Sequence, residues 1–227
     1  MLIYAPLTML TFFVPPLPRY RFIRQWGRFN IWWLKVTCNL AYTVEGREHL
    51  PNIPSVILAK HQSTWETLAF QFLFPPHVWI LKRDLLWIPF FGWGLYMTQP
   101  IAINRGAFKK AVGHILEQGQ QRLRTGRWIL VFPEGTRMPV GQQRRFGKSG
   151  ALLASTAGCA IVPVAHNAGS YWPRRGFIKH PGTIRVVIGP SITTSGRGAD
   201  EITQQAEAWM ETTMTELEER TQIRIAH

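Results

Sequence analysis

The amino-acid sequence predicts an α/β domain, built as a mixed sheet flanked by helices, with an N-terminal helical segment that associates with a membrane. Three observations lead to this fold class. Strand-like and helix-like segments alternate after Gly46, several strand-like segments are apolar throughout, and an aromatic helical stripe precedes them. The 227 residues suit one domain with a small appendage. We therefore assign residues 1–40 to the N-terminal segment and residues 41–227 to the domain.

The N-terminal segment contains two apolar stretches. Residues 1–14 are apolar, but they include Pro6, lack a basic start and are shorter than the roughly 20 residues that a bilayer span needs. We expect them to dip into a membrane or lie on it. Packing of this arm on the core is the alternative.

A helix over residues 20–35 is expected to lie in a membrane surface. Its aromatic residues recur at helical spacing and its arginines cluster on the flank, as in interfacial helices. The alternative is a helix that packs its aromatic side chains into the core and leaves the arginines in solvent. The aromatic residues are Phe22, Trp26, Phe29 and Trp33, and the arginines are Arg21, Arg24 and Arg28.

The elements of the domain follow in order along the chain. Apolar runs predict buried strands, and apolar residues at helical spacing predict helices. Residues 85–103 carry no charge and contain two prolines and two glycines. They form either an irregular surface for lipid or an acyl chain, or a core strand with loops. The expected strands are 55–60, 78–81, 99–103, 128–132, 160–165 and 183–188, and the expected helices are 63–74, 107–123, 149–157 and 202–217.

The charge balance limits the partners that suit this chain. It has 26 Lys and Arg against 13 Asp and Glu, a formal charge of +13, yet 46% of its residues are hydrophobic and its mean hydropathy is −0.05. With 10 Trp and 13 Phe it is no disordered basic tail. Nucleic acid or an anionic membrane surface would suit such a chain. The aromatic residues form apolar runs, and no nucleic-acid-binding motif is present, so we expect a membrane and no nucleic acid.

The motif HQSTWE, residues 61–66, follows a predicted buried strand. A histidine with a nearby carboxylate is a general-base pair, in which the carboxylate fixes the imidazole tautomer. His61 and Glu66 would diverge on one regular helix, but they can meet if His61 lies in the loop and the helix begins at Ser63. Ser63 and Glu66 also fit a capping box, so on the residues alone the catalytic and the structural role of Glu66 stay equally open.

Two further motifs also follow predicted strands. FPEGTR, residues 132–137, combines a turn-forming Gly135 with Thr136 and Arg137, which are suited to binding a phosphate, while Glu134 is placed to orient an arginine or a substrate hydroxyl. A strand-end turn with a surface salt bridge is the alternative. In INRG, residues 103–106, Arg105 ends a strand and is expected at the same edge of the sheet.

Several other chemistries are disfavoured. Gly141 and Gly147 have five residues between them instead of the four of a phosphate-binding loop, and no G-x-S-x-G motif of a serine hydrolase is present. Cys38 and Cys159 belong to no Cys/His cluster, so we expect no metal and two buried thiols.

Taken together, these motifs resemble the four sequence blocks of the glycerolipid acyltransferases, in order and near the usual spacing. The four matching segments are HQSTWE, INRG, FPEGTR and IVPVAH, the last through its strand-end Pro163. The similarity runs from about Val44 to Ile192, and within the family it is to the bacterial enzymes that acylate 1-acylglycerol-3-phosphate. It implies an α/β acyltransferase fold for residues 41–227. It also implies transfer of a fatty acyl group from a thioester to a lysophospholipid hydroxyl, on lysophosphatidic acid or on an alternative acceptor such as glycerol-3-phosphate.

The resemblance also implies roles for individual residues. His61 corresponds to the base that deprotonates the acceptor hydroxyl, and Glu66 to its carboxylate partner, which is usually Asp in the family. The phosphate-binding set corresponds to Arg105, Glu134, Gly135, Thr136 and Arg137. The expected partners are an anionic membrane surface, a lysophospholipid and a thioester of coenzyme A or acyl carrier protein. No other cofactor is expected, and the implied location is the cytoplasmic face of the inner membrane.

Overall fold

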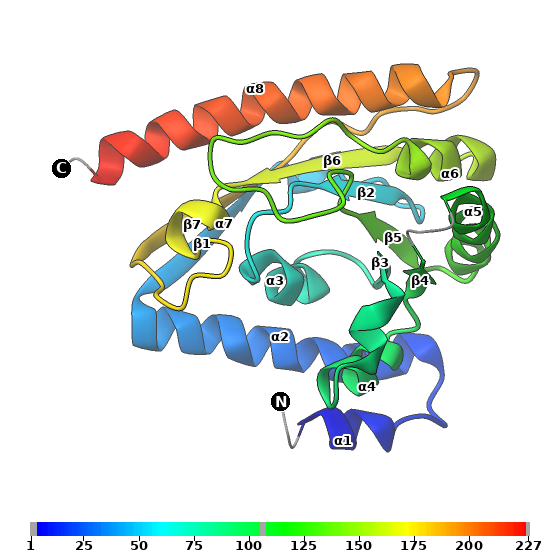
Figure 1. The fold of residues 1–227 in the computed structure, drawn as a ribbon, viewed down its shortest axis with the longest axis horizontal. Helices are drawn as coiled ribbons and strands as arrows, with labels where there is room; N and C mark the ends of the chain where they lie inside the picture. The colour runs from blue at the N-terminus through cyan, green and yellow to red at the C-terminus, as the bar shows by residue number, and fades with distance from the viewer. Residues whose placement is uncertain (1–3, 105–107, 226–227) are drawn as a thin grey trace.

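The computed structural model describes residues 4–104 and 108–225, which form a sheet with helices on both of its faces (Figure 1). The seven strands lie in the order β1-β7-β6-β2-β5-β3-β4, and neighbours are parallel except for the antiparallel pair β6 and β7. The predicted mixed sheet is confirmed. The strands are β1 (Leu40–Glu45), β2 (Val56–Ala59), β3 (His77–Lys82), β4 (Ile101–Ile103), β5 (Trp128–Val131), β6 (Ile161–His166) and β7 (Gly182–Ile188).

The central strands are apolar throughout because helices cover both faces of the sheet. In β2, Ile57 and Ala59 pack toward α2 (Pro16–Cys38) and α3 (Trp65–Leu73), whereas Val56 and Leu58 pack toward the opposite layer. That layer contains α5, α6 and α8, and α8 runs along the top of the view in Figure 1. Its helices are α5 (Phe108–Arg124), α6 (Ser149–Ala157) and α8 (Ala199–Ile225).

The motifs come together because β2, β5 and β6 are parallel. Their carboxyl ends lie at one edge of the sheet, so the residues that follow Ala59 and Val131 meet there. His166, the last residue of β6, lies at the same edge. Loops at the carboxyl ends of parallel strands are the usual place for a binding site in such sheets.

The N-terminal helices have one buried and one exposed face. α2 buries Tyr20, Ile23 and Ile31, and it packs against α3. The predicted aromatic stripe lies mainly outside: Phe22, Phe29 and Trp33 are exposed and Trp26 is half-buried, so the interpretation that placed these rings in the core is wrong.

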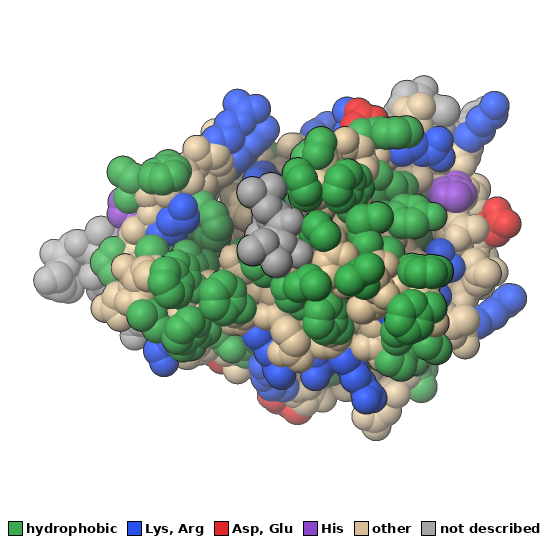
Figure 2. Space-filling view, turned by 90° about the horizontal axis from the view of Figure 1, so that it is seen from below, with side chains coloured by type: hydrophobic (Ala, Val, Ile, Leu, Met, Phe, Trp, Pro, Cys, Tyr) green, Lys and Arg blue, Asp and Glu red, His purple; other side chains and the backbone are tan. Residues whose placement is uncertain are grey.

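Other exposed apolar side chains extend this surface. They come from the turn after α1 (Tyr4–Met9) and from two short helices, η2 (Arg83–Trp87) and α4 (Phe91–Tyr96). Figure 2 shows hydrophobic side chains gathered over this face, with lysine and arginine along its edges and few acidic residues. Within residues 4–104 and 108–225, no helix combines the length and apolar character needed to cross a membrane. The most exposed of these side chains are Leu10, Phe12, Phe13, Trp87 and Tyr96.

The structure adds elements that the sequence did not indicate. β1 was missed because it follows α2 directly, with only Asn39 in the left-handed conformation (φ 49°) between them, and no Gly or Pro marks the break. The segment 85–103 divides into η2, α4 and the short β4, so neither interpretation of it describes it fully. The 3-10 helix η1 (Arg47–His49) and the short α7 (Ala168–Tyr171) were also missed.

Candidate active site

His61 and Glu66 are in contact at the carboxyl end of β2. Nδ1 of His61 lies 2.8 Å from Oε1 of Glu66, and the Glu66 side chain is fully buried whereas 14% of the His61 side chain is exposed. The contact forms because His61 lies in the loop before α3, which begins at Trp65, two residues later than expected. An ionised carboxylate can only accept, so Nδ1 carries the proton and Nε2 is left with a free lone pair.

Glu66 also caps the helix that carries it. Its carboxylate accepts hydrogen bonds from the backbone N–H of Gln62 (3.0 Å) and of Ser63 (2.8 Å), while the Ser63 hydroxyl accepts one from the N–H of Trp65 (3.2 Å). This pattern resembles a capping box, except that the Ser63 hydroxyl accepts from the N–H two residues along the chain instead of three. The two roles proposed for Glu66 from the sequence therefore do not compete, because one carboxylate holds His61 and the start of α3 together.

The surroundings of Glu66 keep its carboxylate ionised. Burial alone would raise its pKa, but the neighbouring His166 and His61 rings and the N–H of Ser63 outweigh burial, so the pKa of Glu66 lies below its ordinary value. It stays ionised at neutral pH and can stabilise a positive charge that develops on His61.

Lys60 and Glu134 form a buried ion pair beneath this loop. Nζ of Lys60 lies 2.5 Å from Oε1 of Glu134 and donates also to the carbonyl of Gln142 (3.2 Å). The second oxygen, Oε2, accepts from the backbone N–H of His61 (3.2 Å). Burial raises the pKa of Glu134, and Lys60 and the His61 N–H oppose that rise. Glu134 thus connects the FPEGTR loop to the main chain of His61.

The other residues of FPEGTR surround the same site. Gly135 has a φ of 70°, the left-handed turn expected there, and its N–H donates to the carbonyl of Phe132 (3.0 Å). The Phe132 ring stacks on the His61 imidazole with the ring centroids 3.8 Å apart. Thr136 and Arg137 are half-buried. Arg105 of INRG lies outside the described residues.

His166 is a site residue that the sequence analysis missed. It is fully buried at the end of β6; its Nε2 donates to the carbonyl of Lys60 (2.9 Å), and its Nδ1 accepts from the N–H of Ala168 (3.2 Å). Burial lowers its pKa, and the neighbouring Glu66 carboxylate opposes that effect. Its position at a strand end, like that of His61, was the available signal.

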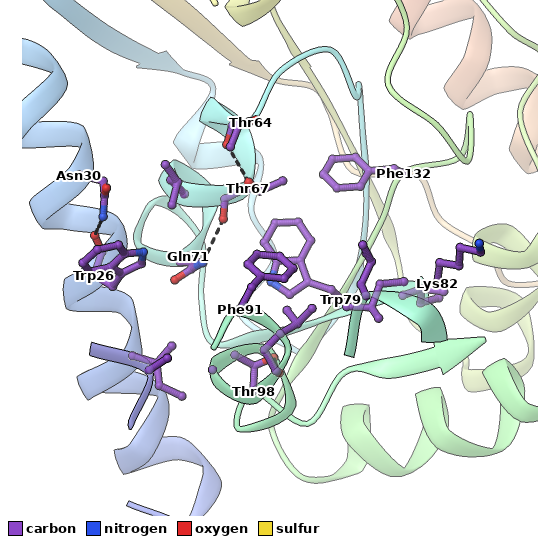
Figure 3. Close-up of a pocket in the computed structure, with 18 of the residues that line it drawn as sticks. Trp26, Asn30, Thr64, Thr67, Gln71, Trp79, Lys82, Phe91, Thr98 and Phe132 are labelled. Carbon is purple, nitrogen blue, oxygen red and sulfur yellow. Dashed lines mark hydrogen bonds between the residues drawn. The ribbon is translucent and has the colours of Figure 1, made fainter. Parts of the chain in front are cut away.

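A cavity of about 470 Å³ opens at His61 and extends toward the N-terminal helices (Figure 3). Phe132 and Trp79 stack with their centroids 5.5 Å apart, so an aromatic wall leads inward from His61. Beyond it, α2 supplies Trp26 and α4 supplies Phe91. Arg137 lines the same cavity. Its volume and mainly apolar lining are typical of a pocket for a small organic ligand.

No group of three or more His, Cys, Asp or Glu among the described residues is arranged to hold a metal ion. Cys38 and Cys159 are free thiols; Cys159 is buried as expected, whereas Cys38 is half-buried.

Comparison with known proteins identifies the class to which this protein belongs. Residues 41–167 match the family model described as Acyltransferase, and this stretch begins where the N-terminal segment was predicted to end. The match covers more than half of the 227 residues. The chain therefore belongs to the acyltransferase family.

Comparison with individual proteins shows which acyltransferases are similar to this chain. The chain is 49% identical over 216 residues to the 1-acyl-sn-glycerol-3-phosphate acyltransferase of Pseudomonas aeruginosa, covering 92% of this chain and 84% of that protein. It is 31% identical over 199 residues to the enzyme of the same name from Escherichia coli, covering 86% and 78%.

A solved structure shows the same fold. The crystal structure of the 1-acyl-sn-glycerophosphate acyltransferase PlsC from Thermotoga maritima superimposes with a TM-score of 0.77 and covers 95% of this chain and 88% of that one. The two sequences are 22% identical, so this likeness concerns the fold alone.

Proposed function

We propose that this protein transfers a fatty acyl group from a thioester donor to the free hydroxyl of lysophosphatidic acid and so forms phosphatidic acid. The observation that carries the proposal is the contact between His61 and Glu66 at the mouth of an apolar cavity. The names of the relatives from Pseudomonas aeruginosa and Escherichia coli support the choice of reaction.

His61 acts as the general base in this reaction. Its Nε2 takes the proton from the acceptor hydroxyl while the hydroxyl oxygen attacks the thioester carbonyl carbon. Glu66 stabilises the imidazolium that forms. The tetrahedral intermediate then expels the thiolate, which takes the proton from His61, so no acyl group is attached to the protein. General-base catalysis of this kind contributes roughly 10²–10⁴ in rate.

The loop 132–137 binds the acceptor phosphate. Arg137 offers a charged fork of N–H donors and Thr136 a hydroxyl, both suited to phosphate oxygens. Gly135 permits the turn that presents them, and Glu134 holds this loop beside His61 through the contacts described above. Arg105 is assigned to the same phosphate from its sequence block. Fixing the phosphate places the hydroxyl next to His61.

The cavity holds an acyl chain. Its lining is mainly apolar. His61 and Arg137 line the end at which the acceptor headgroup reacts, and Tyr4, Thr8 and Thr98 line the part near α1. This assignment develops the expectation that the apolar segment 85–103 serves lipid or an acyl chain, since Phe91 and Leu95 line the cavity.

Residues 1–40 associate with the membrane, and residues 41–227 form the acyltransferase domain. The exposed aromatic side chains of α2 and of the turn after α1 insert among anionic lipids, with Arg21 and Arg28 at the headgroups. The proposed location is the cytoplasmic face of the inner membrane, where the thioester of coenzyme A or of acyl carrier protein is available as donor.

One assay tests the proposed reaction. Purified protein is supplied with acyl-coenzyme A or acyl carrier protein thioester, and with lysophosphatidic acid, glycerol-3-phosphate or lysophosphatidylcholine as acceptor. We expect phosphatidic acid from lysophosphatidic acid and much slower transfer to the others. Preference for glycerol-3-phosphate would assign the alternative acceptor, and no transfer from either donor would contradict the proposal.

A further inference from the structure

The segment between α7 and β7 presents an unusual apolar tip. Phe177 is 90% exposed and Ile178 is 69% exposed, although no motif of the active site includes them. Exposed apolar side chains that adjoin one another and are rimmed by polar residues are typical of a surface that contacts a partner or a membrane. We call residues 172–180 the basic loop.

Basic side chains surround that tip. Arg174 and Arg175 precede it and Lys179 follows it, with no acidic residue in the basic loop. Nζ of Lys179 lies 4.6 Å from the ring centroid of Trp172 and 4.9 Å from that of Phe177, so the ammonium is held beside the apolar tip. Cations that flank an apolar tip suit a surface with anionic headgroups above hydrocarbon.

Hydrogen bonds connect the basic loop to the proposed phosphate-binding loop on one side and to the end of α2 on the other. Nη1 of Arg174 donates to the carbonyl of Arg137 (2.9 Å), in the loop assigned to the acceptor phosphate. Just beyond the other end, the N–H of Gly182, the first residue of β7, donates to the carbonyl of Asn39 (3.0 Å), which terminates α2. In Figure 1 the yellow segment after α7 turns down toward this end of α2.

The exposed face of α2 continues toward the same attachment. Its last turns expose Trp32, Trp33 and Val36. The basic loop therefore begins at the active-site edge and ends beside the hydrophobic face shown in Figure 2.

We propose that the basic loop is a second membrane contact: Phe177 and Ile178 enter an anionic phospholipid bilayer, and Arg175 and Lys179 bind its headgroups. Through Arg174, this contact holds the Arg137 side of the site against the lipid surface from which the acceptor comes. The inference rests on the membrane association proposed above, but it concerns residues that are far from the N-terminal segment in the sequence.

The test compares three variants of the purified full chain on vesicles. Phe177→Ser combined with Ile178→Ser removes the apolar tip. Ile53→Ser is the matched control, because Ile53 is similarly exposed (59%) but precedes β2, at the opposite end of that strand from His61. The vesicles contain phosphatidylethanolamine and phosphatidylglycerol, or phosphatidylcholine alone, and bound protein is measured by sedimentation.

We expect the Phe177/Ile178 variant to bind the anionic vesicles at least roughly tenfold more weakly than wild type. The reason is that two large apolar side chains are no longer transferred from water into the bilayer. The control variant should bind like wild type. Arg175→Gln combined with Lys179→Gln should weaken binding to the anionic vesicles and leave binding to phosphatidylcholine unchanged. Turnover of a short-chain, water-soluble lysophosphatidic acid should be unaltered in every variant.

Equal vesicle binding by wild type and the Phe177/Ile178 variant would overturn the inference. So would unchanged vesicle binding with a raised KM for acyl carrier protein, because the loop would then dock the donor protein. Failure of the proposed function is a separate result: wild type would not acylate the soluble acceptor, while the difference in vesicle binding would still support the loop contact.

Discussion

Nζ of Lys60 and Oε1 of Glu134 lie 2.5 Å apart, in a buried ion pair between the strand end that precedes His61 and the FPEGTR loop. The same carboxylate accepts a hydrogen bond from the His61 N–H, so a charge pair fixes the main chain of the proposed base. Breaking one side of such a pair leaves an uncompensated buried charge, which is strongly destabilising.

Lys60→Met should therefore lower the free energy of unfolding by about 3 kcal/mol, because the Glu134 carboxylate loses its buried partner. Adding Glu134→Gln should recover most of that loss, since no buried charge remains. Urea unfolding of both variants measures the coupling. The matched control is Lys148→Met: Lys148 pairs with Asp200 at 2.6 Å, but both side chains are more than half exposed, so the change should stay below about 1 kcal/mol. Strictly additive effects of Lys60→Met and Glu134→Gln would contradict this interpretation.

Glu66→Gln should reduce kcat by roughly 10²–10⁴ while the fold is retained, because the amide fills the same space but cannot stabilise a charged His61. Glu66→Asp keeps the charge and should keep more activity, although the shorter side chain cannot satisfy both His61 and the N–H of Ser63 as well. Steady-state kinetics and thermal unfolding distinguish the two effects. Equal activity of the two variants would argue against a role for the charge.

Thr98→Phe should shift acyl selectivity toward shorter chains. Thr98 lines the cavity on the side away from Phe132, so a ring there shortens the space for an acyl chain without touching His61 (Figure 3). A series of donors with increasing chain length measures the change in kcat/KM. If long and short donors were slowed equally, the cavity would not be the acyl site.

His77 should make stability depend on pH. Burial lowers the pKa of His77 from 6.5 to about 4, so as the pH falls below 6.5 the unfolded chain gains a proton that the folded chain does not accept. Stability from this group is complete above pH 6.5 and is lost progressively toward pH 4, by about 3 kcal/mol in total. Urea unfolding of wild type and His77→Gln across this range should give a difference that shrinks as the pH falls. A constant difference would contradict the buried neutral state.

The sequence was sufficient for the fold class, and it gave the condition under which His61 and Glu66 meet, namely that His61 lies in the loop before the helix. Apolar runs mark buried parallel strands, and parallel strands bring their carboxyl ends, and the motifs that follow them, to one edge. The choice between catalysis and capping for Glu66 could not be made from spacing, because it depends on the loop path of residues 61–64, along which one carboxylate reaches both groups.

Contacts between residues far apart in the chain could not be predicted from the sequence. Lys60 and Glu134 are 74 positions apart, and nothing in the pattern around either residue indicates that they pair. The strand Leu40–Glu45 carries few apolar residues for burial because it is at the edge of the sheet, and His166 reads as the end of an ordinary apolar strand. These features depend on how distant segments pack, which local periodicity does not encode.

The most direct test of the central claim is the turnover of His61→Ala with lysophosphatidic acid and an acyl thioester, measured on protein whose thermal unfolding matches wild type. The account predicts a loss of roughly 10²-fold or more in kcat, since the group that takes the acceptor proton is gone. Phosphatidic acid formation close to the wild-type rate would contradict it.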